Sequence, residues 1–413
     1  MQKITSESLE RIGSAIHGAL AELIANQGRF PRPTELARRW ELDQTLCVRT
    51  CRALRHEEPL RVLHHLPSTG SLRSILAAGR SHGAPAAICS RVATAIDGLE
   101  AAISALGGKK ANLDTLIGSQ LLEAREKIEA TSKQSIFRGM SNLLGLQCDV
   151  SLTSYFVYPS EDDPERCDEL AIYGSSGLRR LRPELPILVG GRILFGEPSQ
   201  ELSQAHEVLY GGKLDRSGFS VALKEFSTDP FPEVRVIQSG TRLIYTLPAD
   251  GGGESQELAM FFASIDRHAS ERWRRRDGAA APFVFVPRNP AKEFLLDVFV
   301  HRDVWPGSEP SLEIGRGENV LTPLAAVRSD IDRLDLRESF KSFGAEPTPA
   351  SFAPLPRYSA MLARVCEDAG LAMEDFRVHR LHVKYPVISL SYALFFPLPD
   401  PPRGARSAAS GTS

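Results

Sequence analysis

The densest group of acid and base side chains in this sequence lies in EFLLDVFVHRDVW, residues 293–305. The segment contains Glu293, Asp297, His301 and Asp303, residue types that exchange protons in general acid–base catalysis. Its apolar pattern predicts a strand, on which Asp297 and His301 share a face. Four residues of strand separate these two side chains by roughly 13 Å, so they cannot touch directly. We therefore expect no catalysis from this segment.

Other reactive residue types also fail to form a recognisable site. Cys47 and Cys51 are spaced for one helix face, where core packing is favoured because no His or acidic partner accompanies them. His379 and His382 point to opposite faces of a strand and so do not share a metal. YGSSGL, LGGKKAN and YGGKLD lack the spacing of a nucleophile elbow or a P-loop, and HExxH is absent. The sequence thus predicts no enzyme, no cofactor and no metal site.

Residues 34–54, TELARRWELDQTLCVRTCRAL, show a clearer pattern of two short helices joined by a turn. Thr34 is suited to cap a helix over residues 35–41, and Asp43 a second helix over residues 44–56. Cys47, Cys51 and Leu54 then face inward, while Ala37 lets the two helices cross closely. The outer face carries polar, basic and one apolar side chain, namely Gln44, Thr45, Val48, Arg49, Arg52 and Arg55.

This segment resembles the helix-turn-helix of bacterial winged-helix regulators of the IclR and MarR kind. The resemblance covers about 20 residues closely and implies that residues 44–56 form a recognition helix in the DNA major groove. It also implies a wing, for which LRVLHHLPSTG (60–70) is the candidate hairpin, although Glu41 occupies a turn position usually held by Gly. The expected DNA-binding residues are Thr34, Arg38, Arg39, Gln44, Thr45, Arg49 and Arg52. Helical hairpins of this kind also occur in folds that bind no DNA.

Charge is unevenly distributed between this region and the rest of the chain. Residues 1–82 contain 12 Lys and Arg against 8 Asp and Glu, whereas the remaining residues contain 37 against 43. A basic module on an acidic body is typical of a protein in which only the first part contacts phosphate. The six cysteines form no CxxC pair, which favours buried thiols in a reducing cytosol.

The pattern along the chain predicts an α+β multidomain protein with four regions. Residues 1–82 are expected to be an all-α (winged) helix-turn-helix domain, and residues 83–147 a helical linker that serves either dimerisation or packing within its own domain. Residues 148–398 contain short β-branched and aromatic runs between Pro and Gly, which predict a strand-rich α+β domain with helices near residues 257–276 and 358–370. Residues 399–413 are expected to be a disordered tail.

These observations favour a cytoplasmic, sequence-specific DNA-binding transcriptional regulator. It would bind double-stranded DNA as a homodimer, and residues 148–398 would sense a small-molecule effector or a partner. No apolar run approaches the length of a membrane span. Two alternatives stay open at this point. One is an enzyme of unrecognised class in residues 148–398 with an accessory helix-turn-helix, and the other is a non-enzymatic protein-interaction module.

Overall fold

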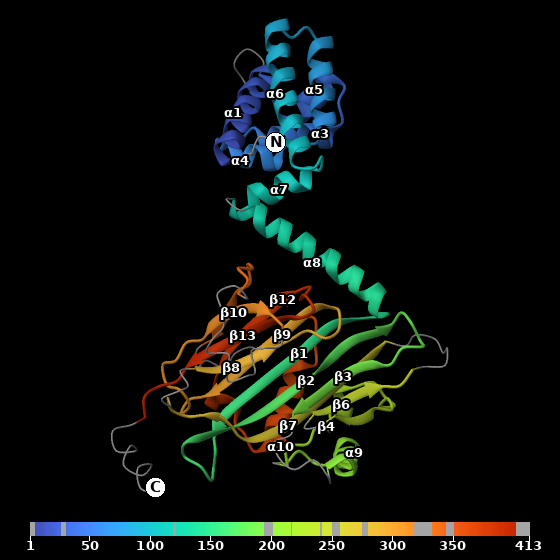
Figure 1. Cartoon of the computed structure of the whole chain (residues 1–413), viewed down its shortest axis with the longest axis vertical. Helices are drawn as coiled ribbons and strands as arrows, with labels where there is room; N and C mark the ends of the chain where they lie inside the picture. The colour runs from blue at the N-terminus through green and yellow to red at the C-terminus, as the bar shows by residue number, and fades with distance from the viewer. Residues whose placement is uncertain are drawn as a thin grey trace. The chain divides into compact units, whose positions relative to one another are not determined.

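The structure is a computed structural model, and it describes residues 5–25, 30–118, 121–193, 201–215, 217–239, 242–249, 257–274, 280–317, 333–343 and 351–401. Within these residues the chain is α+β, with α-helices α1 to α10 and three β-sheets (Figure 1). It divides into two compact units, Met1–Thr131 and Ser132–Ser413. Each unit is considered by itself below.

The described part of the N-terminal unit is built from helices around one apolar core. α1 (Ser6–Ile24) begins at a capping box on Thr5 and buries one stripe of its surface, as its helical spacing of Leu and Ile predicts. α6 (Ala86–Ala105) packs along α1. The remaining helices are α2 (Pro33–Trp40), α3 (Gln44–Ala53), α4 (Pro59–His65), α5 (Thr69–Ser81), α7 (Lys110–Gly118) and α8 (Leu122–Leu144), the last of which crosses the boundary between the units.

Helices α2 and α3 occupy the segment that the sequence predicts as two short helices. The Asp43 carboxylate caps α3 by accepting a hydrogen bond of 2.9 Å from the backbone N–H of Leu46, which confirms its predicted role. Glu41 adopts a left-handed φ of 54° at the end of α2. The prediction that Thr34 caps α2 is wrong, because the helix begins one residue earlier with Pro33, whose missing N–H suits a first helical position.

The predicted wing is also wrong. Residues 60–70 form no hairpin, because α4 runs to His65 and α5 begins at Thr69. Two local signals explain the difference: Pro59 opens α4 at its first position, and the Ser68 hydroxyl caps α5 by accepting from the N–H of Ser71. The DNA-binding heads of winged-helix regulators carry a hairpin at this point, so the described N-terminal unit departs from the expected winged architecture.

The C-terminal unit is built on a seven-stranded sheet with the order β11-β12-β9-β1-β2-β7-β4. Two further three-stranded sheets have the orders β10-β13-β8 and β3-β6-β5. The strands are β1 (Leu146–Pro159), β2 (Arg166–Arg180), β3 (Ile187–Ile193), β4 (Val221–Ala222), β5 (Arg235–Ser239), β6 (Arg242–Leu247), β7 (Leu258–Glu271), β8 (Ala280–Phe285), β9 (Ala291–His301), β10 (Ser311–Arg316), β11 (Phe340–Phe343), β12 (Phe376–Lys384) and β13 (Leu390–Pro397).

The large sheet is covered on both faces. Helix α10 (Tyr358–Ala369), predicted from the sequence, packs on one face through Met361, Leu362 and Val365. On the other face β8, β10 and β13 cover β9 and β12, whereas β3, β5 and β6, together with α9 (Glu201–Gly211), cover β2 and β7. In Figure 1, β8, β10 and β13 lie to the left of β1 and β2, whereas β3 and β6 lie to the right. The second layer is therefore two separate sheets.

The helix predicted near residues 257–276 is wrong, since residues 258–271 form strand β7. Phe261, Ala263 and Ile265 join the core beneath α10, as the alternation of a strand requires. None of the described helices is long and apolar enough to cross a membrane. The predicted disordered tail lies, from residue 402 onward, outside the described residues.

Candidate functional site

A cavity of about 450 Å³ lies where the second layer of the C-terminal unit is divided. Its volume is in the usual range for sites that bind small molecules. β1, β2 and β7 form its floor, while β3 and β6 on one side and β8 on the other form its walls. Most of the floor consists of alternate residues of these strands, with Leu152 and Gly174 also reaching it; the alternate residues are Ser151, Thr153, Tyr155, Glu169, Ala171, Tyr173, Ser175, Ser264 and Asp266.

Two carboxyl groups lie next to each other on this floor. Glu169 of β2 and Asp266 of β7 are cross-strand partners in the antiparallel ladder, so their side chains leave one face of the sheet about 5 Å apart. Burial, and to a smaller extent the negative charge of Asp266, raise the pKa of Glu169 to about 7. The Ser270 hydroxyl donates to Glu169 Oε1 and opposes this shift, because the hydrogen bond favours the carboxylate.

Tyr155 of β1 completes this end of the floor. Burial raises the pKa of the Tyr155 phenol, and the charges of Glu169 and Asp266 both add to the shift, which places the three groups within electrostatic reach of one another. A phenol with a raised pKa stays a neutral hydrogen-bond donor at pH 7. The floor thus offers a proton-donating phenol beside a pair of carboxyl groups, of which Glu169 has a pKa raised to about 7.

The rim of the cavity has the opposite charge. Arg242, at the start of β6, and Arg288, in the loop after β8, line the cavity and are exposed to solvent. The amide of Asn289 donates a hydrogen bond of 2.7 Å to the carbonyl of Leu188, so the loop after β8 is joined to the first residues of β3. The two walls therefore meet at this end of the cavity.

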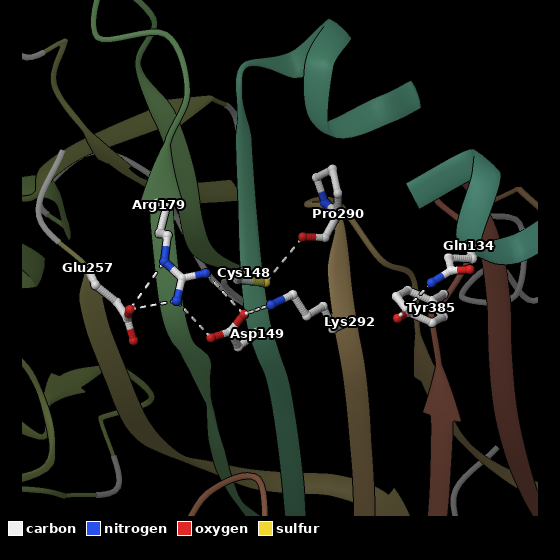
Figure 2. A network of polar contacts seen from close by, with 8 residues as sticks. All are labelled: Gln134, Cys148, Asp149, Arg179, Glu257, Pro290, Lys292 and Tyr385. Atoms are coloured by element: carbon white, nitrogen blue, oxygen red, sulfur yellow. Dashed lines mark hydrogen bonds and ion pairs between the residues drawn. The ribbon is translucent and has the colours of Figure 1, made fainter. Parts of the chain in front are cut away.

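A polar network holds the neighbouring end of the large sheet (Figure 2). Asp149 of β1 accepts from both terminal nitrogens of Arg179, at 3.3 and 3.2 Å, and from Lys292 Nζ at 2.7 Å. Arg179 also donates to Glu257 at 2.6 and 3.1 Å. These side chains are partly exposed and mutually paired, so the network fixes β1, β2 and β9 at this end rather than offering an open binding site.

The acid and base residues of segment 293–305 do not come together. Glu293 pairs with His382 at 2.5 Å, and His301 lies near Asp303 and Asp375. Asp297 is fully buried on the opposite face of the sheet from the cavity, where it accepts two hydrogen bonds from Arg380 and one from Tyr358. In the described part of the chain no three His, Cys, Asp or Glu residues are arranged to hold a metal ion.

The predicted DNA-binding residues lie on helices α2 and α3, and most are exposed. Thr34, Arg38, Gln44, Thr45, Arg49 and Arg52 all face solvent, as does Val48 with an exposed fraction of 44%. Arg39 differs, because it is half-buried, donates to the carbonyl of Ile24 at 3.3 Å and lies over the ring of Trp40. Cys47 and Cys51 are buried in the core, as predicted.

Comparison with known proteins assigns no family. No protein-family model matches this chain, and no curated protein matches it either. Its structure is similar to that of a two-domain M1 zinc metallopeptidase, solved as a mutant with bound L-tryptophan. The sequences are 11% identical, and the similarity covers 60% of this chain but only 42% of the peptidase, with a TM-score of 0.22. A score this low does not define a shared fold or activity.

The prediction of a sequence-specific DNA-binding transcriptional regulator is contradicted. The comparisons give no DNA-binding family. The segment expected to form the wing is helical. The cavity of the C-terminal unit instead directs attention to the alternative that residues 148–398 form an enzyme.

No local pattern in the sequence marks Glu169 and Asp266 as site residues. They lie almost a hundred residues apart, and only the pairing of β2 with β7 brings them together. Asp266 also falls within the segment expected to be helical, where its side chain would have had no partner on β2. Recognising residues 258–271 as a strand would have placed Ser264 and Asp266 on one face and given half of the site.

Proposed function

We propose that the C-terminal unit is an enzyme that uses Glu169 and Asp266 for general acid–base catalysis on a molecule bound in the cavity. The observation that carries this proposal is the position of two carboxyl groups as cross-strand partners on the floor of the cavity, beside the phenol of Tyr155. Adjacent carboxyl groups resist simultaneous ionisation, so one of them holds a proton while the other is charged. An acid and a base are then available in the same place.

Hydrolysis is the reaction class that best suits this pair. The charged carboxylate of Asp266 would accept a proton from a water molecule as its oxygen attacks the substrate. The protonated Glu169 would give its proton to the leaving group as the bond to that group breaks. The two steps transfer one proton each, and exchange with solvent restores the starting states. A pKa of Glu169 near 7 makes it an effective acid at neutral pH.

The test is a screen of the full chain against chromogenic esters, glycosides, phosphoesters and peptides. Any activity found is then measured in Glu169→Gln and Asp266→Asn, with Glu374→Gln as the matched control because Glu374 is exposed and lies outside the cavity. We expect each cavity variant to lose activity by 10²-fold or more, on the order of a general acid–base contribution, and the control to keep it. Equal activity in all four proteins would remove the carboxyl pair from the mechanism.

We further propose that the N-terminal unit is an accessory interaction module, in which α2 and α3 form the helix-turn-helix hairpin. The support is the exposed face of α3, where Val48 lies among polar and basic side chains. We also propose that the chain forms a homodimer through this face. Sedimentation equilibrium of the full chain and of Val48→Asp tests both: a shift toward monomer in the variant supports this face as the contact, and an unchanged mass contradicts it.

A further inference from the structure

The division of the second layer leaves two strand edges at the cavity. β3 is the outer strand of the sheet β3-β6-β5, and β8 is the outer strand of the sheet β10-β13-β8. Within the described residues neither strand has a partner on its second side. An unpaired edge presents a row of backbone N–H and C=O groups that can pair with another strand.

Both outer strands line the cavity. The lining residues are 188–191 from β3 and 284–286 from β8 and the residue after it. Of the sheet β10-β13-β8 only β8 and the loop after it contribute, and of the sheet β3-β6-β5 only β3 and the start of β6, so the gap between the two small sheets lies at β3 and β8. Gly190 and Gly191 add no side chain to this edge of β3.

The cavity has the length of a short strand. Its floor follows β2 from Ser175 to Glu169, and six residues of strand extend for roughly 20 Å. The walls meet where Asn289 contacts Leu188, at the start of β3 and just after the end of β8, so β3 runs away from that point and β8 runs toward it. A strand placed between them would be antiparallel to one and parallel to the other.

The side chains beneath the gap differ from those beneath the two small sheets. Where β9 and β12 are covered they present Phe294, Leu296 and Leu381 to the second layer. Below the gap the floor presents small or polar residues instead, among them Ser151, Thr153, Ala171 and Ser264. A bound strand therefore finds room for its own side chains and hydroxyl groups to contact them. The carboxyl pair lies at one end of this floor.

We propose that the cavity binds an extended peptide segment of another protein by β-strand addition, with a Lys or Arg side chain of the peptide placed at Glu169 and Asp266. This inference goes beyond the proposed function, because a cation held at the carboxyl pair makes the peptide a ligand of the cavity and not the molecule cleaved there. The peptide backbone would bond to the edges of β3 and β8 and join the two small sheets into one continuous layer. Backbone pairing supplies affinity in this mode, and side-chain pockets supply specificity. A cationic side chain is the one that the carboxyl pair complements in charge.

The experiment begins with a displayed library of random octapeptides selected on the full chain. We expect the retained peptides to share a Lys or Arg at one fixed position. One retained peptide is then resynthesised with a single N-methyl group at each amide in turn. Loss of a strand-edge hydrogen bond should weaken binding about three- to tenfold, at alternate amides for pairing with one edge and at successive amides for pairing with both. Photo-crosslinking from the same peptide should map to residues 188–191 and 284–286.

Three results would overturn the inference: no octapeptide retained by folded protein, affinity unaffected by N-methylation at every position, or crosslinks confined to residues outside the cavity. The double variant Glu169→Gln/Asp266→Asn separates this inference from the proposed catalysis. We expect it to bind the peptide backbone while losing the preference for Lys or Arg by tenfold or more. Peptide binding by a native chain that hydrolyses none of the screened substrates supports the strand-addition site and contradicts the enzyme. Hydrolysis of a non-peptide substrate with no peptide binding does the reverse.

Discussion

Removing the charge of Asp266 should lower the pKa of Glu169, and the size of this change can be worked out from the pairing of β2 with β7. Cross-strand partners have Cβ atoms about 5 Å apart, which we take as the separation of the two charges. At an effective dielectric constant of about 20 to 40, two unit charges at that distance repel by roughly 1.7–3.3 kcal/mol, or about one to two pKa units. Asp266→Asn should therefore lower the pKa of Glu169 from about 7 by about one unit, at the low end of this range, because the charge of Asp266 is a smaller influence on this pKa than burial or the Ser270 hydrogen bond. Burial, which is the larger cause of the shift, stays in place and keeps the pKa above that of a free Glu.

A second substitution should move the same pKa in the opposite direction. The hydroxyl of Ser270 donates to Glu169 and stabilises its carboxylate, so Ser270→Ala should raise the pKa of Glu169. Infrared difference spectra of the protonated carboxyl stretch, recorded against pH with Glu169→Gln as the blank, measure the titration directly. A native Glu169 that titrates near the pKa of a free Glu, or one whose pKa does not respond to Asp266→Asn, would refute the reasoning on the carboxyl pair.

Three further predictions concern stability, each measured by denaturant unfolding. Because the pKa of Glu169 is raised on folding, its contribution to the free energy of unfolding is fully present below the pKa of Glu in the unfolded chain and is lost as the pH rises through about 7. Over this pH range Glu169→Gln should therefore become more stable relative to the native protein, by at most about 3 kcal/mol. Asp297→Ala should cost about 3–5 kcal/mol because Arg380 loses its buried partner, whereas removing the exposed Arg302 should cost under about 1 kcal/mol; equal costs would contradict the burial argument. Gly177→Ala should destabilise by about 1–3 kcal/mol, since φ is +67° and a Cβ would lie 2.5 Å from Asp149 Oδ2, and a neutral result would contradict that geometry.

Much of the N-terminal unit follows from local sequence. The Asp43 cap and the buried spacing of Cys47 and Cys51 fix α3 without reference to the rest of the chain. The wing failed as a prediction because the resemblance was extended beyond the residues that carried it. Pro59 and Ser68 are ordinary helix-start residues, and their local preferences already favoured α4 and α5 over a hairpin.

The C-terminal unit shows what local reasoning misses. The general α+β character and α10 follow from composition and spacing, but β7 does not, because a run such as ELAMFFASI fits both a helix and a buried strand. Its state is decided by pairing with β2, from Arg166 opposite Glu271 to Leu178 opposite Leu258. The candidate site depends on that same non-local register, so neither residue of the carboxyl pair could be assigned from its neighbours in sequence.

The composition of the cavity floor indicates that the gap in the second layer is a built feature. Protein interiors are closely packed, and an accidental void between two sheets would be lined by the same large apolar residues as the core around it. Here Phe262 and Tyr245 fill the space beneath β6, and Phe283 and Phe294 fill the space beside β8. Between them the floor is formed mainly by hydroxyl, carboxyl and small side chains, whereas the walls are largely apolar. A few polar groups gathered on the floor between apolar walls are typical of a site that binds and orients a ligand.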